Sequence, residues 1–424
     1  MDRGGAGILR RSSVPARNHR VTTNPSRDSE PRDPSRAPGA ILFTAFEPSG
    51  DAHAAPVIAA IRRLDPARPI YAWGGPKMAA AGAEVVEQTA GDGVIAVPSL
   101  ARIGAFLGEM RRIETFAARS RVALHVPVDS PAANFPIAKR LRRAGARVVH
   151  LVAPQFWAWG AWRRKKLQRT TDLVLCLLPF EEAWFRERGI PARFVGHPVI
   201  NRELDRNAIA AQARELPRGS PRILLLPGSR SSEIKKNLGL LMRVFADLQA
   251  LHHGMGGLIV AASPEIAASI RERHPSMPTG LHVVTAESRD GHGILDAAVA
   301  WCDLAITVSG TVSLDVARQA KPMVGVYKTG LVGVLGGRAV LRIPDRLLPN
   351  IIAGKRIVPE FVPYAGGPGP IVDAAESLLK DSRRTAEASH ELRQMLAKFR
   401  GHDFAEESAQ AILKFLGGER SGGA

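Results

Sequence analysis

Short apolar runs alternate with longer amphipathic segments from Ala40 to the end of the chain. A short apolar run fits a strand buried on both faces of a sheet, and the longer segments carry apolar residues at helical spacing. This alternation is typical of βαβ units around parallel sheets. The expected strands are 41–45, 70–73, 122–126, 148–152, 173–178 and 193–195 in a first series, and 223–226, 257–261, 282–284, 304–307 and 322–326 in a second.

The two series predict an α/β protein with two Rossmann-like domains that face each other across a cleft. The polar, turn-rich segment 201–221 separates the series and is expected to connect the domains. We place the first domain at 39–202 and the second at 203–424, the latter ending in helices with apolar faces between 372 and 418. Residues 1–38 are rich in Arg, Pro and Ser without apolar periodicity, which predicts a disordered basic tail.

Composition narrows the class of protein. With 424 residues, 45% hydrophobic and 23% charged, the chain is long enough and apolar enough for two folded domains. The net charge of +18 favours an anionic partner such as nucleic acid, anionic lipid or a phosphorylated substrate, although high arginine usage alone would also explain it. The most apolar long stretch, 94–107, contains Pro98 and Arg102, so no membrane-spanning helix is expected. Two cysteines in apolar runs give no disulfide framework and no zinc site.

Two strand-to-helix turns in the second series have the composition of phosphate-binding turns. Small residues at a helix start let backbone N–H groups approach an anion, and an arginine can donate two hydrogen bonds to phosphate oxygens. Both turns follow strands of one sheet, so both would contact one nucleotide diphosphate, with Asp315 at the ribose. The alternative is a pair of ordinary helix starts. The candidate nucleotide-binding residues are Gly228, Ser229, Arg230, Ser309, Gly310, Thr311 and Asp315.

The loops after two strands of the first series carry carboxylates. Glu47 and Asp51 follow the run 41–45, and Asp129 follows the run 122–126. Functional sites of α/β proteins are built at the carboxyl ends of strands, which favours a site here. A single Asp before a helix is commonly only a cap, and that alternative stays open for both aspartates.

An aromatic cluster and a histidine complete the candidates. Three of the six tryptophans lie between Trp157 and Trp162, next to the basic run 163–166. One such cluster without an alternating pattern does not support nucleic acid as the partner. His197 follows the run 193–195 and is either an acid, base or phosphate donor in the cleft, or a hydrogen-bonded hinge residue.

A helical stripe between 100 and 113 has the composition of a membrane-surface helix. Arginines at 102, 111, 112 and 119 lie close to it, and such helices bind anionic lipid. The stripe would also suit a buried core face. If the substrate is a lipid, we expect the stripe to line the entrance for its acyl chains. Its members are Leu100, Ile103, Phe106, Leu107, Met110 and Ile113.

Ten motifs, in this order along residues 41–361, resemble the lipid-A-disaccharide synthase family, whose members are inverting glycosyltransferases of the GT-B architecture. They are Glu-Pro-Ser-Gly-Asp at 47–51, Asp-Ser-Pro-Ala-Ala-Asn at 129–134, Pro-Gln-Phe-Trp-Ala-Trp at 154–159, Leu-Pro-Phe-Glu at 178–181, Gly-His-Pro at 196–198, Leu-Leu-Pro-Gly-Ser-Arg at 225–230, Ser-Gly-Thr at 309–311, Lys-Pro-Met at 321–323, Leu-Pro-Asn-Ile-Ile-Ala-Gly at 348–354 and Pro-Glu-Phe at 359–361.

The resemblance implies transfer of 2,3-diacylglucosamine from UDP to the 6-hydroxyl of 2,3-diacylglucosamine 1-phosphate, which forms the β-1,6-linked lipid A disaccharide. It implies that Asp129 is the general base and that no metal or cofactor takes part. Glu47 and His197, which follow strands of the first series, are further catalytic candidates. The resemblance also implies a peripheral protein on the cytoplasmic face of the inner membrane, with a homodimer as an open alternative. The candidate acceptor-side residues are Ser49, Gly50, Asp51, Asn134 and Trp157.

The chain departs from the family pattern mainly on the acceptor side. The second acid of the family's Asp-Ala-Pro-Asp-Phe-Asn run is Ala132 here, its opening Gly-Glu is Phe46-Glu47, and the nucleotide-side Glu is Asp315. The alternatives are therefore a UDP-sugar transferase with a different acceptor, or a weakly active homologue. A different class, a non-catalytic protein that binds nucleic acid or membrane, would show tight, salt-dependent RNA binding without UDP binding.

Overall fold

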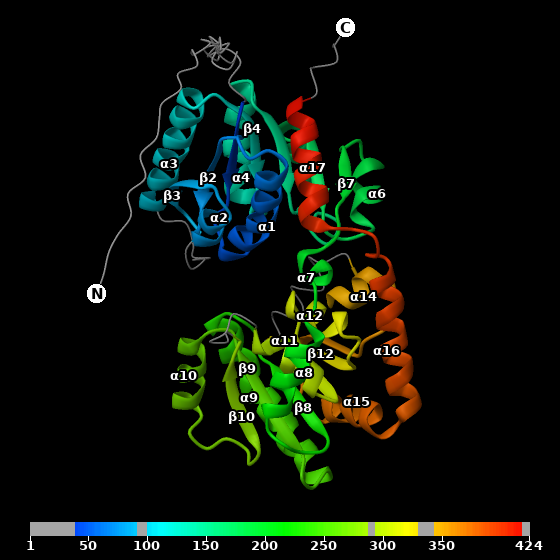
Figure 1. The fold of residues 1–424 in the computed structure, drawn as a ribbon. Coiled ribbons are helices and arrows are strands. Elements are labelled where there is room, and N and C mark those ends of the chain that lie inside the picture. The colour runs from blue at the N-terminus through cyan, green and yellow to red at the C-terminus, as the bar shows by residue number, and fades with distance from the viewer. Residues whose placement is uncertain (1–38, 91–99, 287–292, 330–342, 418–424) are drawn as a thin grey trace, which may run out of the picture. The chain divides into compact units, whose positions relative to one another are not determined.

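Two parallel β-sheets form the framework of the chain (Figure 1). The computed structural model describes residues 39–90, 100–286, 293–329 and 343–417, so the predicted basic tail lies outside the described residues. All strand pairs within each sheet are parallel, as the alternation of apolar runs and helical segments predicts. The prediction of an α/β protein with two Rossmann-like sheets is confirmed.

The first sheet has seven strands in the order β3-β2-β1-β4-β5-β6-β7. The strands are β1 (Ala40–Thr44), β2 (Ile70–Gly74), β3 (Glu84–Gln88), β4 (Val122–Pro127), β5 (Arg147–Leu151), β6 (Leu173–Cys176) and β7 (Ala192–Phe194). The helices of this part of the chain are α1 (Pro48–Leu64), α2 (Pro76–Ala80), α3 (Leu100–Arg119), α4 (Pro131–Arg143), α5 (Arg164–Thr170), α6 (Glu181–Arg186) and α7 (Pro198–Asn201), with a 3-10 turn, η2 (Ala161–Arg163).

The second sheet has six strands in the order β10-β9-β8-β11-β12-β13. The strands are β8 (Arg222–Leu226), β9 (Gly256–Ala261), β10 (Leu281–Thr285), β11 (Leu304–Val308), β12 (Met323–Lys328) and β13 (Glu360–Tyr364). The helices are α8 (Arg206–Glu215), α9 (Ser231–Leu251), α10 (Pro264–Arg273), α11 (Ile294–Trp301), α12 (Val312–Arg318), α14 (Leu348–Ala353), α15 (Gly369–Lys380), α16 (Ser382–Ala397) and α17 (Phe404–Gly417).

All eleven predicted strands are present, and two further strands, β3 and β13, lie at sheet edges. The sequence of β3, EVVEQ, alternates between exposed and half-buried positions, so it lacks the continuous apolar run that marks the central strands. The expected connection at 201–221 contains α8, a helix whose first turn is capped by the Asp205 side chain. Polar composition therefore identified the connection but not the helix inside it.

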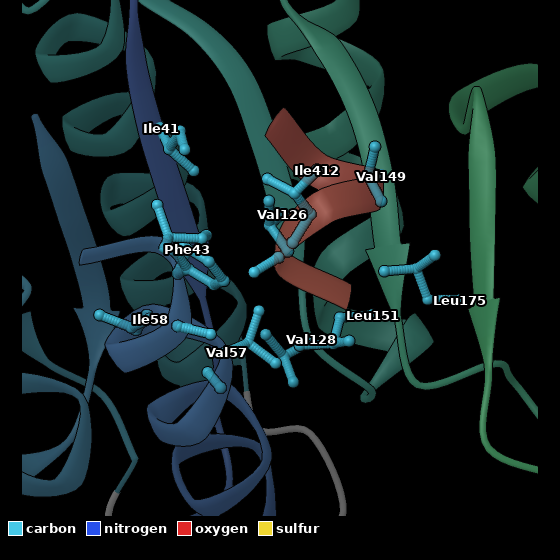
Figure 2. Packing of buried hydrophobic residues seen from close by; sticks show 14 of the residues in the cluster. Ile41, Phe43, Val57, Ile58, Val126, Val128, Val149, Leu151, Leu175 and Ile412 are labelled. Carbon is cyan, nitrogen blue, oxygen red and sulfur yellow. The ribbon is translucent and has the colours of Figure 1, made fainter. Parts of the chain in front are cut away.

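The core of the first sheet lies between its strands, α1 and the last helix of the chain (Figure 2). Ile41 and Phe43 of β1 are fully buried, and so are Val57 and Ile58 of α1. Complete burial of each such side chain stabilises the fold by roughly 1.5–3 kcal/mol. Ile412 of α17 belongs to the same cluster, and α17 packs against α1. The range 203–424 thus includes a terminal helix whose side chains complete the first core.

Helix α3 carries the apolar stripe that was expected to line the entrance for acyl chains. Met110 and Ile113 are buried against Leu42, Trp73 and Leu141 beneath the first sheet, so their assignment to a membrane face is wrong. The buried-core alternative holds for this end of the helix because the sheet needs an apolar cover here. Phe106 packs edge to face on Phe46, whereas Leu107 is 42% exposed. The side chains of Leu100 and Ile103 lie outside the described residues.

Within the ranges that the structure describes, none of the helices combines the length and the apolar character needed to cross a membrane.

Candidate active site

The sheet orders place the predicted site residues at two equivalent positions. In the first sheet the chain winds outward in opposite directions from β1 and β4, and in the second from β8 and β11. Ligands of open α/β sheets bind beyond the carboxyl ends of the strands at such a switch point. Glu47 follows β1 and Asp129 follows β4, while the two small-residue turns follow β8 and β11. Topology therefore brings each predicted pair of loops together.

The loop that carries Asp129 has an unusual backbone. Asp129 and Ser130 have φ values of 48° and 39°, a left-handed conformation that costs free energy for residues other than glycine. Neighbouring strands hold the loop in place, since the Val128 N–H donates to the Thr44 carbonyl at 2.9 Å and the Asp129 N–H donates to the Leu151 carbonyl at 3.0 Å. The loop is thus fixed between β1 and β5, which orients the Asp129 side chain.

A buried chain of hydrogen bonds supports the same loop from below. The Asn134 side-chain amide donates to the carbonyl oxygens of Val128 at 3.1 Å and Asp129 at 2.9 Å. Its Oδ1 accepts from the Thr44 hydroxyl at 2.7 Å, and that hydroxyl pairs with Nε2 of His125 at 2.8 Å. Because Thr44 gives its proton to Asn134, His125 must be the donor to Thr44, which fixes its tautomer. Asn134, a predicted acceptor-side residue, therefore positions the loop.

The Asp129 carboxyl group has a raised pKa. Burial is the main cause, and the negative charge of Glu47 adds to it, whereas a hydrogen bond from the Ser130 backbone opposes it. Ser130 also links the two acids, because its hydroxyl donates to Oε1 of Glu47 at 3.1 Å. A carboxylate of raised pKa is a stronger base than an ordinary one, so this group is suited to accept a proton from a hydroxyl.

The predicted residues that follow Glu47 lie in the first turn of α1, where Gly50 and Asp51 have structural roles. Gly50 lets α1 approach the sheet, since a Cβ atom there would lie 2.9 Å from Cβ of Ala45. Ser49 is exposed. The Asp51 carboxylate is buried and accepts three hydrogen bonds from the first turn of α2, donated by the N–H groups of Gly75, Lys77 and Met78. The structure therefore accounts for Asp51 as a cap, but on α2 and not on the helix that directly follows it in the sequence, since Asp51 itself lies within α1.

Trp157 lies apart from the Asp129 loop in its contacts. Its indole Nε1 donates to Oε1 of Glu181 at 2.9 Å, and its ring packs edge to face on Phe180 at 5.0 Å. Glu181 also accepts from the backbone N–H groups of Leu177 and Leu178, and burial raises its pKa to about 7 despite these hydrogen bonds. Trp157 thus belongs to a buried structural contact with the Leu-Pro-Phe-Glu segment.

His197 matches the hinge alternative. Its Nδ1 accepts from the Val199 N–H at 3.2 Å and caps α7, and its backbone N–H donates to the Asn201 side chain at 2.7 Å. Burial, with a smaller contribution from His53, lowers its pKa to about 3. A neutral imidazole whose Nδ1 is already engaged cannot donate a proton from that atom. These contacts favour a structural role for His197, at the start of the connection to the second domain, over a role as an acid or base.

The side chain of Glu233 binds the backbone of the turn that follows β8. Oε2 of Glu233 accepts from the backbone N–H groups of Ser229 at 3.3 Å and Arg230 at 3.4 Å, and Oε1 pairs with the Arg230 guanidinium at 3.3 Å. Gly228 has a φ of 113°, and a Cβ atom there would clash with Glu233, so glycine is required. The carboxylate occupies the donors that an anion would use, as expected of a site built for negative charge.

The second turn is anchored to the loop before α14. The Ser309 hydroxyl donates to the Arg346 carbonyl at 3.0 Å, and the carboxylate of Glu360 accepts from the backbone N–H groups of Arg346 and Leu347. Asn350 donates a further hydrogen bond to Glu360 at 3.0 Å. Gly310 is half-buried and Thr311 is exposed at the start of α12. Two of the sequence motifs, at 348–354 and 359–361, therefore act together to position this turn.

Asp315 lies in a cluster of charged side chains. Its Oδ1 is 3.7 Å from the Arg202 guanidinium, which also pairs with Asp296 at 3.0 Å. Arg318, almost fully buried, bonds to Asp296 at 2.7 Å and to the Val199 carbonyl. Burial raises the pKa of Asp315 to about 6, although the two arginines oppose this shift. The cluster ties α7 to α11 and α12, so Asp315 has a structural partner beside any role at a ribose.

Several of these groups were missed at the sequence level. Thr44 and His125 lie within strands, and a polar residue inside an apolar run is the signal that could have identified them. Glu233 lies three residues after Arg230, the capping-box spacing. In the described part of the chain, no cluster of three or more His, Cys, Asp or Glu side chains could hold a metal ion.

Comparisons with known proteins agree with these motifs. The family model described as "Lipid-A-disaccharide synthetase" matches residues 41–415. The chain is 32% identical over 384 residues to the lipid-A-disaccharide synthase of Solibacter usitatus, an alignment that covers 89% of this chain and 98% of that protein. It is 34% identical over 343 residues to the enzyme of the same name from Anaeromyxobacter sp. strain K, which covers 80% and 88%.

Solved structures share the architecture at low sequence identity. The fold is similar to that of Anabaena Alr3699/HepE in complex with UDP-glucose, with a TM-score of 0.56, 12% identity and coverage of 89% of this chain and 99% of that one. It is also similar to S. aureus MnaA in a co-structure with UDP, with a TM-score of 0.59, 12% identity and coverage of 88% and 95%. These likenesses identify the expected GT-B fold.

Proposed function

The chain belongs to the lipid-A-disaccharide synthetase family of glycosyltransferases, and from this premise we propose that it transfers 2,3-diacylglucosamine from UDP to 2,3-diacylglucosamine 1-phosphate. The products are the β-1,6-linked lipid A disaccharide and UDP. The observation that carries the proposal is the Asp129 loop, in which a half-buried carboxyl group of raised pKa is held at the switch point of the first sheet. Such a group is what the deprotonation of an acceptor hydroxyl requires.

In the proposed reaction, Asp129 takes the proton of the acceptor's 6-hydroxyl while the oxygen attacks the anomeric carbon of the donor sugar. The bond from that carbon to the UDP oxygen breaks on the opposite face, which inverts the configuration, and UDP leaves with the bonding electrons. Ser130 connects Glu47 to the base, and the charge of Glu47 adds to the main effect of burial in raising the pKa of Asp129.

We assign the UDP-binding role to the two turns of the second sheet. The N–H groups of Ser229 and Arg230 and the Arg230 guanidinium already hold a carboxylate, so they suit a phosphate oxygen. Donors fixed in advance can stabilise the charge that develops on leaving UDP. Two proteins of the same fold whose solved structures contain UDP-glucose or UDP support the assignment.

The acyl chains of both substrates would keep them at a bilayer surface. We therefore propose that the enzyme works as a peripheral protein on the cytoplasmic face of the inner membrane. The exposed Leu107 and the arginines of α3 remain candidates for this contact.

The test is release of UDP by the purified chain when it is given UDP-2,3-diacylglucosamine and 2,3-diacylglucosamine 1-phosphate in detergent micelles. We expect UDP and disaccharide in equal amounts, with no UDP when the acceptor is left out. If UDP were released only with a non-phosphorylated or differently acylated acceptor, the alternative of a UDP-sugar transferase with a different acceptor would be favoured. Absence of UDP binding in calorimetry would contradict the proposal, since a weakly active homologue would still bind the nucleotide.

A further inference from the structure

A basic groove runs between α4 and α5 and begins at the Asp129 loop. It has a volume of about 940 Å³, within the range of sites for small ligands. One wall is a face of α4 that starts at Pro131, two residues after Asp129, and the other is a face of η2 and α5. In parallel βαβ units both helices start at the carboxyl edge of the sheet, so the start of the groove lies at the edge where Asp129 is found.

The charge of the groove is of one sign. Seven lysines and arginines line it, and none of the described lining residues is acidic; the seven are Lys139, Arg142, Arg143, Arg163, Lys165, Lys166 and Arg169. Of these seven cations, Arg142 is the only one that pairs with a carboxylate among the described residues, that of Asp172. So many cations facing one cavity without counter-charges repel each other, and an anionic ligand would relieve that repulsion.

Arg163 at the start of the groove is held in a fixed orientation. Its guanidinium stacks on Trp159 at 3.9 Å and lies 5.6 Å from the rings of Phe156 and Trp162. Its buried Nε has no hydrogen-bond partner in the described structure. A Cβ atom at Gly160 would lie 2.9 Å from this Nε, so glycine makes room for the arginine. A guanidinium that is held in this way by aromatic rings is pre-ordered to donate to phosphate oxygens from its terminal N–H groups.

Apolar surfaces lie next to these cations. The Lys166 ammonium group is 5.5 Å from the ring of Phe135, one helical turn from the Asp129 loop. Trp162 is 78% exposed and offers a flat face to a sugar ring or an acyl chain. The start of the groove thus combines a phosphate donor set with an apolar wall.

We propose that this groove binds the phosphate group of the acceptor, with Arg163 and Lys166 as its ligands. The inference rests on the proposed function and adds the feature that selects a phosphorylated acceptor. In glucosamine 1-phosphate the phosphate is on C1 and the 6-hydroxyl is on the CH2 group of C5, so the two groups extend from the carbons on either side of the ring oxygen. A phosphate bound at the start of the groove would therefore leave the hydroxyl free to reach Asp129.

The experiment compares 2,3-diacylglucosamine 1-phosphate with 2,3-diacylglucosamine as acceptors in micelles, for the full chain and for Lys166→Gln and Arg163→Gln. The measured quantity is the ratio of kcat/KM for the two acceptors. We expect the ratio to fall about 10- to 100-fold in each variant, as for a lost charge-assisted hydrogen bond. The KM for the UDP-sugar donor should not change. Lys414→Gln, an exposed lysine of α17, is the matched control and should keep the wild-type ratio.

Calorimetry separates failure of this site from failure of the proposed function. Binding of 2,3-diacylglucosamine 1-phosphate that is lost in Lys166→Gln supports the site even if no UDP is released. An unchanged acceptor ratio in folded variants overturns the site while the enzyme stays active. Loss of binding to phosphatidylglycerol vesicles, or to single-stranded RNA, with an unchanged ratio would also overturn it, because the groove would then dock a bilayer or a nucleic acid.

Discussion

The two switch points of the molecule have the same topology but differ in how their polar groups are satisfied. At the first, the Asn134 side chain donates to two carbonyl oxygens of the Asp129 loop and is itself held by the Thr44 hydroxyl, which leaves the Asp129 carboxyl group for a ligand. At the second, the carboxylate of Glu233 occupies the N–H groups of the turn itself. The first site is therefore built before a substrate arrives, whereas the second must exchange an internal partner for a phosphate.

This difference fits the chemistry required at each position. A general base must be held where the proton is removed, and a displacement of even 1 Å lowers the rate greatly. A nucleotide must bind and leave in every cycle, so donors that are kept satisfied by a nearby carboxylate avoid the cost of being buried without a partner. We therefore expect the first site to be rigid and the second to exchange its partner, and substitutions at each site can separate the two behaviours.

The largest effect is expected from Asp129→Asn. We expect kcat to fall by about 10² to 10⁴ because an amide cannot accept the hydroxyl proton. Affinity for UDP should not change, since Asp129 belongs to the first sheet. Steady-state rates and calorimetry measure the two quantities, and Asp247→Asn, on the exposed face of α9, is the control. Wild-type turnover in the variant would remove Asp129 as the base.

Asp51→Ala should have its effect on stability. The buried carboxylate accepts three backbone hydrogen bonds at the start of α2, and its loss should lower the free energy of unfolding by about 3 kcal/mol. Urea denaturation followed by circular dichroism measures this change. Asp205→Ala, which removes an exposed cap from α8, should cost only about 1 kcal/mol. A stable variant with a raised KM for the acceptor would instead restore Asp51 to the acceptor side.

Thr44→Val tests the buried support of the loop. Valine keeps the shape but leaves His125 and Asn134 without their partner, which should cost about 1–3 kcal/mol of stability. We also expect kcat to fall roughly tenfold, with the donor KM unchanged, as the loop loses its fixed position. Thr44→Ser keeps the hydroxyl and should restore both values. Equal rates for the two variants would show that the network does not position Asp129.

The histidines of this region should make the first domain sensitive to acid. Burial lowers the pKa of His150 to about 3, whereas an unfolded histidine titrates near 6.5. Between these values the unfolded chain binds more protons, so the free energy of unfolding falls as the pH falls, by about 1.4 kcal/mol per pH unit for each such histidine. His150→Leu should remove one such contribution between pH 6 and pH 4.

Urea denaturation at several pH values measures that slope. The ring nitrogens of His150 have no partner among the described groups, so leucine should not lower stability at pH 7. His253→Leu, at an exposed position, controls for loss of an imidazole. An unchanged slope in His150→Leu would mean that acid unfolding begins elsewhere.

The sequence predicted the loops of both sites because their signals are local. Apolar runs give the strands, and topology then brings the loops after the central strands to the switch points. It did not predict which groups satisfy the loops, since Thr44 and Asn134 are 90 residues apart and meet only after β1 and β4 pair. The same limit applies to Asp51 and His197, whose caps on α2 and α7 could not be separated from functional roles by spacing alone.

The smallest effect is expected from Glu233→Gln, and its sign is informative. A phosphate that enters the turn must displace the carboxylate from Ser229 and Arg230, and the two negative charges repel each other. Glutamine has the same shape without the charge, so UDP affinity should rise about three- to fivefold, or roughly 0.5–1 kcal/mol at a partly exposed site. Arg230→Ala removes a proposed phosphate ligand and should lower UDP affinity, which makes it the control of opposite sign. Calorimetry with UDP measures both variants. If both variants bound UDP as the wild type does, the turn after β8 would not be the phosphate site. Glu233 would then be only part of an ordinary capping box at the start of α9, and the proposed difference between the two switch points would be wrong.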